Sequence, residues 1–158
     1  MPDNQVRNIA PFINVRFLIT SPWWQPRYNP VTGNYEYHHG LDIATSGGAD
    51  PVFSMLTGHI HSKGTNSARG NWVIVANDIQ GTPFYGYATL YMHLRYAVSY
   101  AVGDSIAAGQ QVGVEGSTGQ STGAHLHVEM QDLTRFNWTW TYTETKSDYL
   151  DPTVFMRY

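Results

Sequence analysis

The sequence GSTGQSTGAHLHVEM, residues 116–130, joins a glycine-rich loop to a segment in which polar and apolar residues alternate. The glycines and small polar residues of 116–123 exclude a stable helix there. In an extended strand, two imidazoles and a carboxylate of the second part share one face and three apolar side chains share the other: His125, His127 and Glu129 against Leu126, Val128 and Met130. The stretch therefore predicts a loop followed by a strand with one polar and one apolar side.

Other short strand-like segments lie on both sides of this one, separated by turns rich in glycine and proline. They are residues 14–20, 58–62, 72–76, 85–93 and 111–114. The nearly continuous apolar run of 72–76 is typical of a central strand buried on both faces. Alternation over 85–93 predicts that His93 shares a polar, aromatic face with Tyr91. No apolar stripe of helical period reaches ten residues, and only 146–156 could hold a short turn, so the class is mainly β with an antiparallel or mixed sheet.

Composition excludes several functional classes. Charged residues make up 13% of the 158 residues and the net charge is −3, which gives no basic surface for nucleic acid. There is no cysteine, so any metal must sit on His, Asp or Glu. No stretch approaches the ~18 consecutive apolar residues of a membrane helix, and the first residues lack the apolar region of a signal peptide. We therefore expect one domain over residues 1–158, a monomer without membrane insertion and no nucleic-acid partner.

Candidate metal ligands also occur in YHHGLDI, residues 37–43. His38 and Asp42 offer an imidazole and a carboxylate four residues apart around Gly40, and zinc accepts both ligand types. Catalytic zinc sites typically use three protein ligands and leave a fourth position for water. Because His125 and His127 project the same way from one strand, with Cα atoms ~6.5–7 Å apart, one can bind the metal while the other faces its open side.

Each motif also has a purely structural interpretation. A histidine pair at i and i+2 is commonly a surface or core feature, and we interpret the second such pair, His59 and His61, in that way. Asp42 could simply hydrogen-bond a turn. The functional interpretation is favoured by the joint occurrence, in this order, of the His38 to Asp42 motif, of YMH at 91–93 and of the loop that leads into His125, because chance rarely assembles all three.

With these motifs in place, the chain resembles the lysostaphin/LytM-type zinc metalloendopeptidases, which are peptidoglycan endopeptidases with a Duplicated hybrid motif-like domain. The resemblance covers residues 13–152, about 90% of the chain. It is carried by five short motifs: His38-x-Gly40-x-Asp42, LYMHL at 90–94, VGD at 102–104 with AGQ at 108–110, GSTG at 116–119, and HLH at 125–127.

The resemblance implies a fold, a metal site and a catalytic pair. The implied fold is a sandwich-like β-sheet domain with long loops walling a groove. His38, Asp42 and His127 are implied as ligands of a Zn²⁺ ion, and His125 and His93 as the catalytic residues beside it. We expect His125 to accept a proton from water and His93 to orient that water or donate to the oxyanion.

The implied substrates are stem or cross-bridge peptides of bacterial peptidoglycan, and the bond stays open among Gly-Gly, D-Ala–Gly, D-Ala–L-Ala and D-Ala–diaminopimelate. The YMH and GSTG motifs favour the glycine-cutting branch. The oxyanion donor among Tyr28, Tyr35 and Tyr37 stays open, as does a role for Asn71, which opens the expected central strand. Aromatic residues are expected along the groove, with about half of the candidates packing in the core or stabilising loops instead. The candidates are Trp23, Trp24, Tyr35, Tyr37, Tyr85, Tyr87 and Tyr91.

Two non-enzymatic interpretations compete with this one. The first is a catalytically silent domain of the same type that binds cell wall or activates another hydrolase, but such domains typically lose a metal ligand, and this chain keeps all of them. The second is a structural subunit of a phage tail. The expected place of action is the bacterial cell wall, and the lack of a visible signal peptide favours a bacteriolytic phage lysin (endolysin), a tail component or a domain cut from a longer exported protein.

Overall fold

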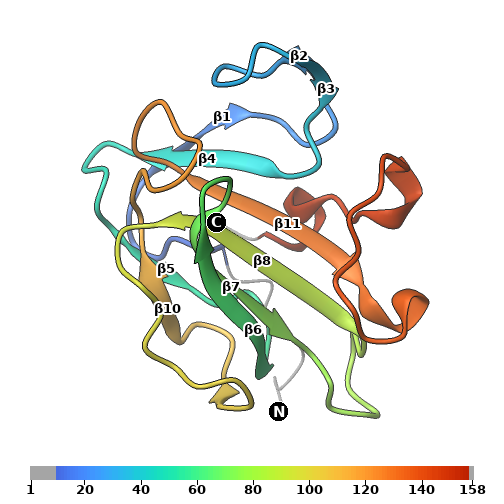
Figure 1. Ribbon diagram of the computed structural model, residues 1–158. Coiled ribbons are helices and arrows are strands. Elements are labelled where there is room, and N and C mark those ends of the chain that lie inside the picture. Colours follow the sequence, from blue (N-terminus) through green and yellow to red (C-terminus); the bar gives the residue numbers. More distant parts are fainter. Residues whose placement is uncertain (1–9, 157–158) are drawn as a thin grey trace.

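An antiparallel sheet of seven strands dominates the computed structural model, which describes residues 10–156 (Figure 1). The strands of the described part are β1 (Phe17–Ser21), β2 (Pro26–Tyr28), β3 (Tyr35–Tyr37), β4 (Leu41–Thr45), β5 (Pro51–Phe53), β6 (Gly58–Asn66), β7 (Gly70–Ala76), β8 (Tyr87–Leu94), β9 (Ser105–Ile106), β10 (Gln111–Val114) and β11 (Leu126–Asp132). Three short 3-10 helices follow β11: η1 (Leu133–Phe136), η2 (Lys146–Asp148) and η3 (Pro152–Phe155). The large sheet has the order β1-β4-β11-β8-β7-β6-β9, and β5 pairs with β10 and β2 with β3.

The main apolar core lies between one face of the large sheet and the β5–β10 pair. Val52 of β5 and Val112 of β10 pack in one cluster with Leu41 of β4 and with Val73 and Val75 of β7. All these side chains are buried, because their strands either alternate polar and apolar residues or are continuously apolar. The predicted mainly β, antiparallel, sandwich-like fold is therefore confirmed.

A smaller apolar cluster covers part of the opposite face of the sheet. Ile74, Ala88 and Leu90 pack there against Leu133, at the start of the segment that follows β11. Three tryptophans border this cluster: Trp72, Trp138 and Trp140. The chain after β11 thus folds back over one end of the sheet, and the rest of that face is available for a site.

The strand predicted around the HLH motif is confirmed, although it begins at Leu126 and leaves His125 in the preceding loop. Leu126, Val128 and Met130 point into the main core, whereas His127 and Glu129 lie on the opposite face. The loop before it, residues 116–123, carries only an isolated bridge between Gly116 and His125. The strand expected for 58–62 continues to residue 66, and the one expected for 14–20 begins only at residue 17.

The predicted face of His93 is wrong. Tyr91 is fully buried in the main core, whereas His93 lies with Met92 on the other side of the sheet. The register between β7 and β8 shifts at this point, and His93 has a positive φ of 63°. Such a β-bulge adds one residue to β8, so strict alternation fails after Met92 and the histidine turns to the site face.

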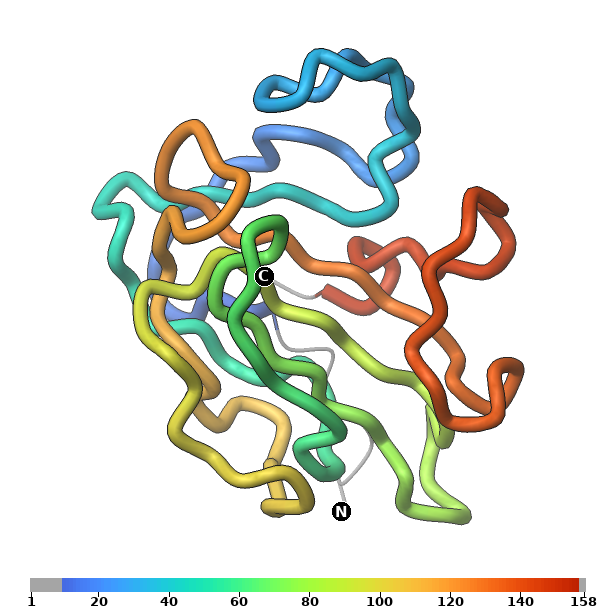
Figure 2. The backbone as a smooth tube through the Cα atoms, viewed as in Figure 1, coloured from blue at the N-terminus to red at the C-terminus, as the bar shows by residue number. Residues whose placement is uncertain are grey.

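Loops from four parts of the chain surround that site face (Figure 2). They are the β2–β3 hairpin, the turn between β6 and β7, the loop of residues 116–125 and the segment of residues 137–145. Within the described residues, no helix is long and apolar enough to cross a membrane.

Candidate metal centre

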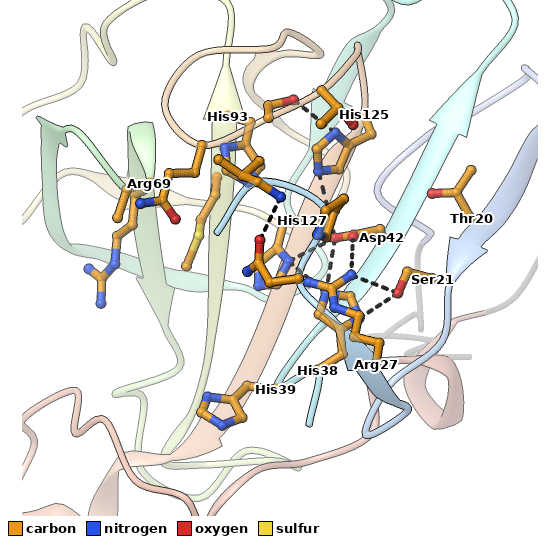
Figure 3. Close-up of a pocket in the computed structure, with 18 of the residues that line it drawn as sticks. Thr20, Ser21, Arg27, His38, His39, Asp42, Arg69, His93, His125 and His127 are labelled. Atoms are coloured by element: carbon orange, nitrogen blue, oxygen red, sulfur yellow. Dashed lines mark hydrogen bonds and ion pairs between the residues drawn. The ribbon is translucent and has the colours of Figure 1, made fainter. Parts of the chain in front are cut away.

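Three predicted ligands meet on the site face of the sheet, where β4 pairs with β11 (Figure 3). Ligand atoms of His38, Asp42 and His127 all lie within 4.8 Å of one another. Asp42 Oδ1 is 2.7 Å from His127 Nδ1 and 3.2 Å from His38 Nε2, and the two ring nitrogens are 3.1 Å apart. All three residues are buried, so this convergence is part of the folded structure rather than a chance surface cluster.

Strand pairing brings these residues together. His127 lies directly opposite Asp42 in the antiparallel register of β11 and β4, so both project to the site face at the same level. Gly40 allows the preceding loop to approach β11, because a Cβ atom at residue 40 would lie 2.5 Å from the Val128 carbonyl oxygen and 2.7 Å from His127 Nε2. The close approach of the loop to β11 therefore explains why a glycine lies between His38 and Asp42.

Outer partners fix the orientation of both histidine rings. His38 Nδ1 is 3.1 Å from the Pro22 carbonyl oxygen, to which it can donate, so Nε2 faces the centre. His127 Nε2 donates to Glu129 at 2.8 Å, so its Nδ1 faces Asp42. Buried acceptors of this kind typically set the tautomer of metal-binding histidines.

The electrostatics of the centre favour a positive charge. Burial by itself would lower the pKa of His127, but Asp42 and Glu129 raise it above its ordinary value. Burial would likewise raise the pKa of Asp42, yet hydrogen bonds and charge from His127 and His38 hold it well below its usual range. Burial lowers the pKa of His38, so this ring is neutral and can donate its lone pair to a cation.

These observations test whether the residues fit a zinc ion, and they do. The donor set consists of two imidazoles and one carboxylate, the ligand types that zinc prefers when cysteine is absent. Two buried carboxylates flank His127, and a divalent cation would neutralise both.

His125 and His93 stand beside this centre, each with one ring nitrogen on a backbone carbonyl. His125 Nδ1 bonds to the Gly123 carbonyl at 2.8 Å, and His93 Nδ1 bonds to the Thr118 carbonyl at 2.7 Å. Their ring centroids are 4.8 Å apart, and His125 Nε2 is 3.7 Å from Asp42 Oδ1. Burial, with the charge of His127 adding to it, lowers the pKa of His93 to about 4. Both rings are therefore held at Nδ1, and Nε2 of His125 faces the carboxylate of the centre.

A cavity of about 670 Å³ contains all five predicted site residues. The prediction of its aromatic lining is largely wrong, because of the seven candidates only Tyr37 lines it. Tyr91 and Tyr87 pack at the main core. Trp24 does not line the cavity; it stacks on Tyr37 and His39 and packs at a tilt against Tyr149. The aromatic residues on the cavity wall are Tyr28, Tyr37, Trp140 and Tyr142.

Among the three tyrosines considered as oxyanion donors, Tyr28 and Tyr37 line the cavity and Tyr35 does not. Asn71 lies outside the cavity, where its amide donates to the Leu94 carbonyl at 3.0 Å and accepts from Thr65. His59 and His61 also lie elsewhere, paired with Asp78 and the Trp138 carbonyl.

Sequence reasoning missed several residues that shape the centre. Glu129 was placed on the correct face but given no role, although its spacing of two from His127 was a usable signal. Arg27 donates to Asp42 at 3.4 Å and to Ser21 at 2.9 Å, and nothing in the sequence marks this contact. The carbonyls that hold His93 and His125 belong to the backbone, which a side-chain motif does not reveal.

Comparison with known proteins gives consistent matches. The profile of peptidase family M23 matches residues 36–142, which contain all five predicted site residues. The DD-carboxypeptidase/endopeptidase Mpg of Neisseria meningitidis serogroup B is 38% identical over 124 residues, covering 77% of this chain and 26% of that protein.

Two solved structures resemble the fold and the sequence. A zinc containing peptidase from Vibrio cholerae has a TM-score of 0.66 at 27% identity, covering 90% of this chain and 38% of that one. The catalytic domain of lysostaphin from Staphylococcus simulans, an antimicrobial peptidase, has a TM-score of 0.65 at 26% identity, covering 90% and 92%. The chain spans less than a third of the length of the curated relatives it matches.

Proposed function

Because this chain belongs to peptidase family M23, we propose that it is a zinc metalloendopeptidase domain that hydrolyses peptide bonds in bacterial peptidoglycan. The observation that carries this proposal is the convergence of His38, Asp42 and His127 beside the imidazoles of His93 and His125, whose Nδ1 atoms are held by backbone carbonyls. The two histidines give the centre acid–base groups that a purely structural metal site does not need.

His38 Nε2, His127 Nδ1 and an oxygen of Asp42 would hold the zinc ion. When bound, zinc lowers the pKa of a coordinated water and polarises the substrate carbonyl. His125 Nε2 accepts the proton of the attacking water, because Nδ1 keeps its own proton on the Gly123 carbonyl. The same nitrogen then returns the proton to the leaving amine. His93, whose depressed pKa keeps it neutral, presents its remaining nitrogen to orient the water.

The substrate class is proposed from the relatives. A curated relative named as a DD-carboxypeptidase/endopeptidase supports a cross-link between D-amino acids, and likeness to lysostaphin supports a cell-wall peptide more generally. We propose the D-Ala–diaminopimelate cross-link as the first bond to test, with a Gly-Gly cross-bridge as the comparison that the YMH and GSTG motifs favour. The place of action is then the bacterial cell wall.

Purified peptidoglycan of both cross-link types, followed by mass spectrometry of the new amine termini, tests the activity. We expect release of new termini by the zinc-loaded protein and none after chelation. His125→Ala should keep zinc and lose at least about 100-fold in turnover, whereas Asp42→Ala should lose both zinc and turnover. His59→Ala, a histidine outside the cavity, is the matched control and should behave as wild type.

Equal hydrolysis by the metal-free protein would exclude the zinc proposal. Wall binding without any new termini would instead favour a silent, wall-binding or hydrolase-activating domain. Full activity of His125→Ala would remove the base assignment.

A further inference from the structure

Arg69 lies on the cavity wall at the turn between β6 and β7, and its backbone is tightly held. Its amide donates to Asn66 Oδ1 at 2.7 Å, and its carbonyl accepts from the His93 amide at 2.9 Å. Arg69 is therefore fixed directly beside one of the two histidines of the proposed catalytic pair. In Figure 3 it lies on the opposite side of the centre from Arg27.

The side chain of Arg69 is restrained, but its guanidinium forms no close ion pair with any residue of 10–156. Its guanidinium lies over the Trp72 ring, 4.8 Å from the centroid, which restrains the long side chain. In that part of the chain the guanidinium also donates no hydrogen bond, and its charge acts only at longer range on Glu129, whose pKa it helps to lower. By contrast, Arg27 pairs with Glu36 and Asp42, Arg95 donates to two carbonyls, and Arg135 pairs with Asp148.

The acids of the cavity are already engaged with other groups. Glu36 accepts from Arg27 and Asn29, Asp42 belongs to the metal centre, and Glu129 accepts from His127. A half-buried arginine that keeps its donors free on the wall of a groove is a ready counterion for an anion in that groove.

We propose that Arg69 binds a free carboxylate of the peptide substrate and thereby makes this domain selective for stem peptides whose side carboxyl groups are not amidated. The proposal rests on the proposed function for the identity of the peptide. The planar guanidinium can offer a carboxylate two parallel N–H donors, and its contact with Trp72 reduces the freedom of the side chain before the anion binds. A Gly-Gly cross-bridge offers no such side carboxylate. Arg69 therefore favours stem peptides whose residues carry a free side carboxylate.

Binding of a product-like tetrapeptide, L-Ala-γ-D-Glu-diaminopimelate-D-Ala, tests this without any cleavable cross-link. Its affinity for the zinc-loaded protein is measured by calorimetry, beside two forms with one amidated carboxyl each, on D-Glu or on diaminopimelate. We expect one of the two amidated forms to bind about ten-fold more weakly than the unamidated tetrapeptide. This difference should shrink as the salt concentration rises, because the contact is only half buried.

Variants of Arg69 distinguish the proposed contact with the carboxylate from a general effect on the site. Arg69→Gln should bind all three peptides with the weaker affinity, and Arg69→Lys should recover only part of the difference, because an ammonium lacks the planar fork. Arg16→Gln removes the same charge from an exposed position outside the cavity and should bind as wild type does. Zinc content and melting temperature of Arg69→Gln should match wild type.

Equal affinity of wild type for all three peptides, or no binding of any, would overturn the proposal. So would an unchanged preference in Arg69→Gln. Failure of the proposed function would give a different result. The protein would then not cleave cross-linked wall, but it would still bind the tetrapeptide more tightly than one of the amidated forms.

Discussion

Glu129 lies behind His127 on the side away from Asp42, and it accepts a hydrogen bond from His127 Nε2 at 2.8 Å. This bond holds the ring in the tautomer whose Nδ1 faces the centre. Removing the negative charge should therefore weaken metal binding although Glu129 is not a proposed ligand.

Glu129→Gln is expected to lower zinc affinity by about 10–100-fold, because outer-shell partners typically contribute that much. Competition with a chromogenic chelator measures the affinity. Asp78→Asn is a matched control, since Asp78 forms a similar contact with His59 outside the cavity. An unchanged zinc affinity of Glu129→Gln would show that the Glu129 carboxylate does not contribute to metal binding through His127.

Tyr91 predicts a specific loss of stability in alkaline solution. Burial raises its pKa to about 12, and its hydroxyl oxygen accepts from the Met55 amide at 2.7 Å. The unfolded chain loses this proton near its ordinary pKa of about 10, before the folded state does, so stability is complete below that pH and is lost as pH rises towards about 12.

The loss assigned to Tyr91 is about 2–3 kcal/mol of unfolding free energy. Urea unfolding at pH 8, 10 and 11 measures it. Tyr91→Phe should be less stable than wild type at pH 8, because the Met55 amide loses its acceptor, and the gap should narrow at higher pH. A constant gap across this range would contradict the assignment.

At the scale of elements, two strands show how far sequence reasoning reaches. β11 was predicted with the correct faces because nothing interrupts its alternation between Leu126 and Met130. β8 contains a bulge after Tyr91 that no residue pattern marks, so the face of His93 was wrong even though its place at the site was expected. Alternation predicts faces only where the pairing register is regular.

The same limit applies to the site. His38, Asp42 and His127 could be proposed because their spacing and their chemistry are both readable in the sequence. Arg27, Arg69 and the carbonyl of Thr118 act through contacts between distant segments, and such contacts follow from packing rather than from any local pattern.

Packing between the β6–β7 turn and the loop of residues 116–123 positions His93. Gly70 has a φ of 63°, and a Cβ atom there would lie 2.3 Å from Thr118 Oγ1 and 2.4 Å from its carbonyl carbon. Thr118 is also the residue whose carbonyl accepts from His93 Nδ1. A side chain at residue 70 must therefore move the loop that orients this histidine.

Gly70→Ala should reduce both stability, by about 2–4 kcal/mol, and kcat, by more than about ten-fold, through the clash and the strained φ. Gly103→Ala is the control, since Gly103 also has a positive φ, of 92°, but nothing lies within 4 Å of its missing Cβ. It should cost about 1–2 kcal/mol of stability and leave kcat unchanged. Denaturation and hydrolysis of cross-linked wall measure the two quantities, and equal kcat in both variants would exclude the loop as the cause.

At the scale of the whole molecule, the proposed ligands join parts of the chain that are far apart in sequence. His38 precedes β4 and His127 lies on β11, 89 residues later, and the two strands are neighbours, second and third in the sheet order. A bound ion would link the β2–β3 side of the groove to β11, which follows directly after His125. Because the unfolded chain does not hold these ligands together, metal binding must stabilise the folded state.

Chelation should therefore lower the thermal unfolding midpoint. At free zinc about 100-fold above Kd the stabilisation is about 2.7 kcal/mol, which corresponds to roughly 5–10 °C for a domain of this size. Differential scanning calorimetry with and without chelator measures the shift. His125→Ala should retain the full shift because His125 is not a proposed ligand, whereas Asp42→Ala should show none. If His125→Ala lost the shift as Asp42→Ala does, His125 would itself be needed for metal binding. The proposed separation of roles, with His127 as metal ligand and His125 as base, would then be wrong.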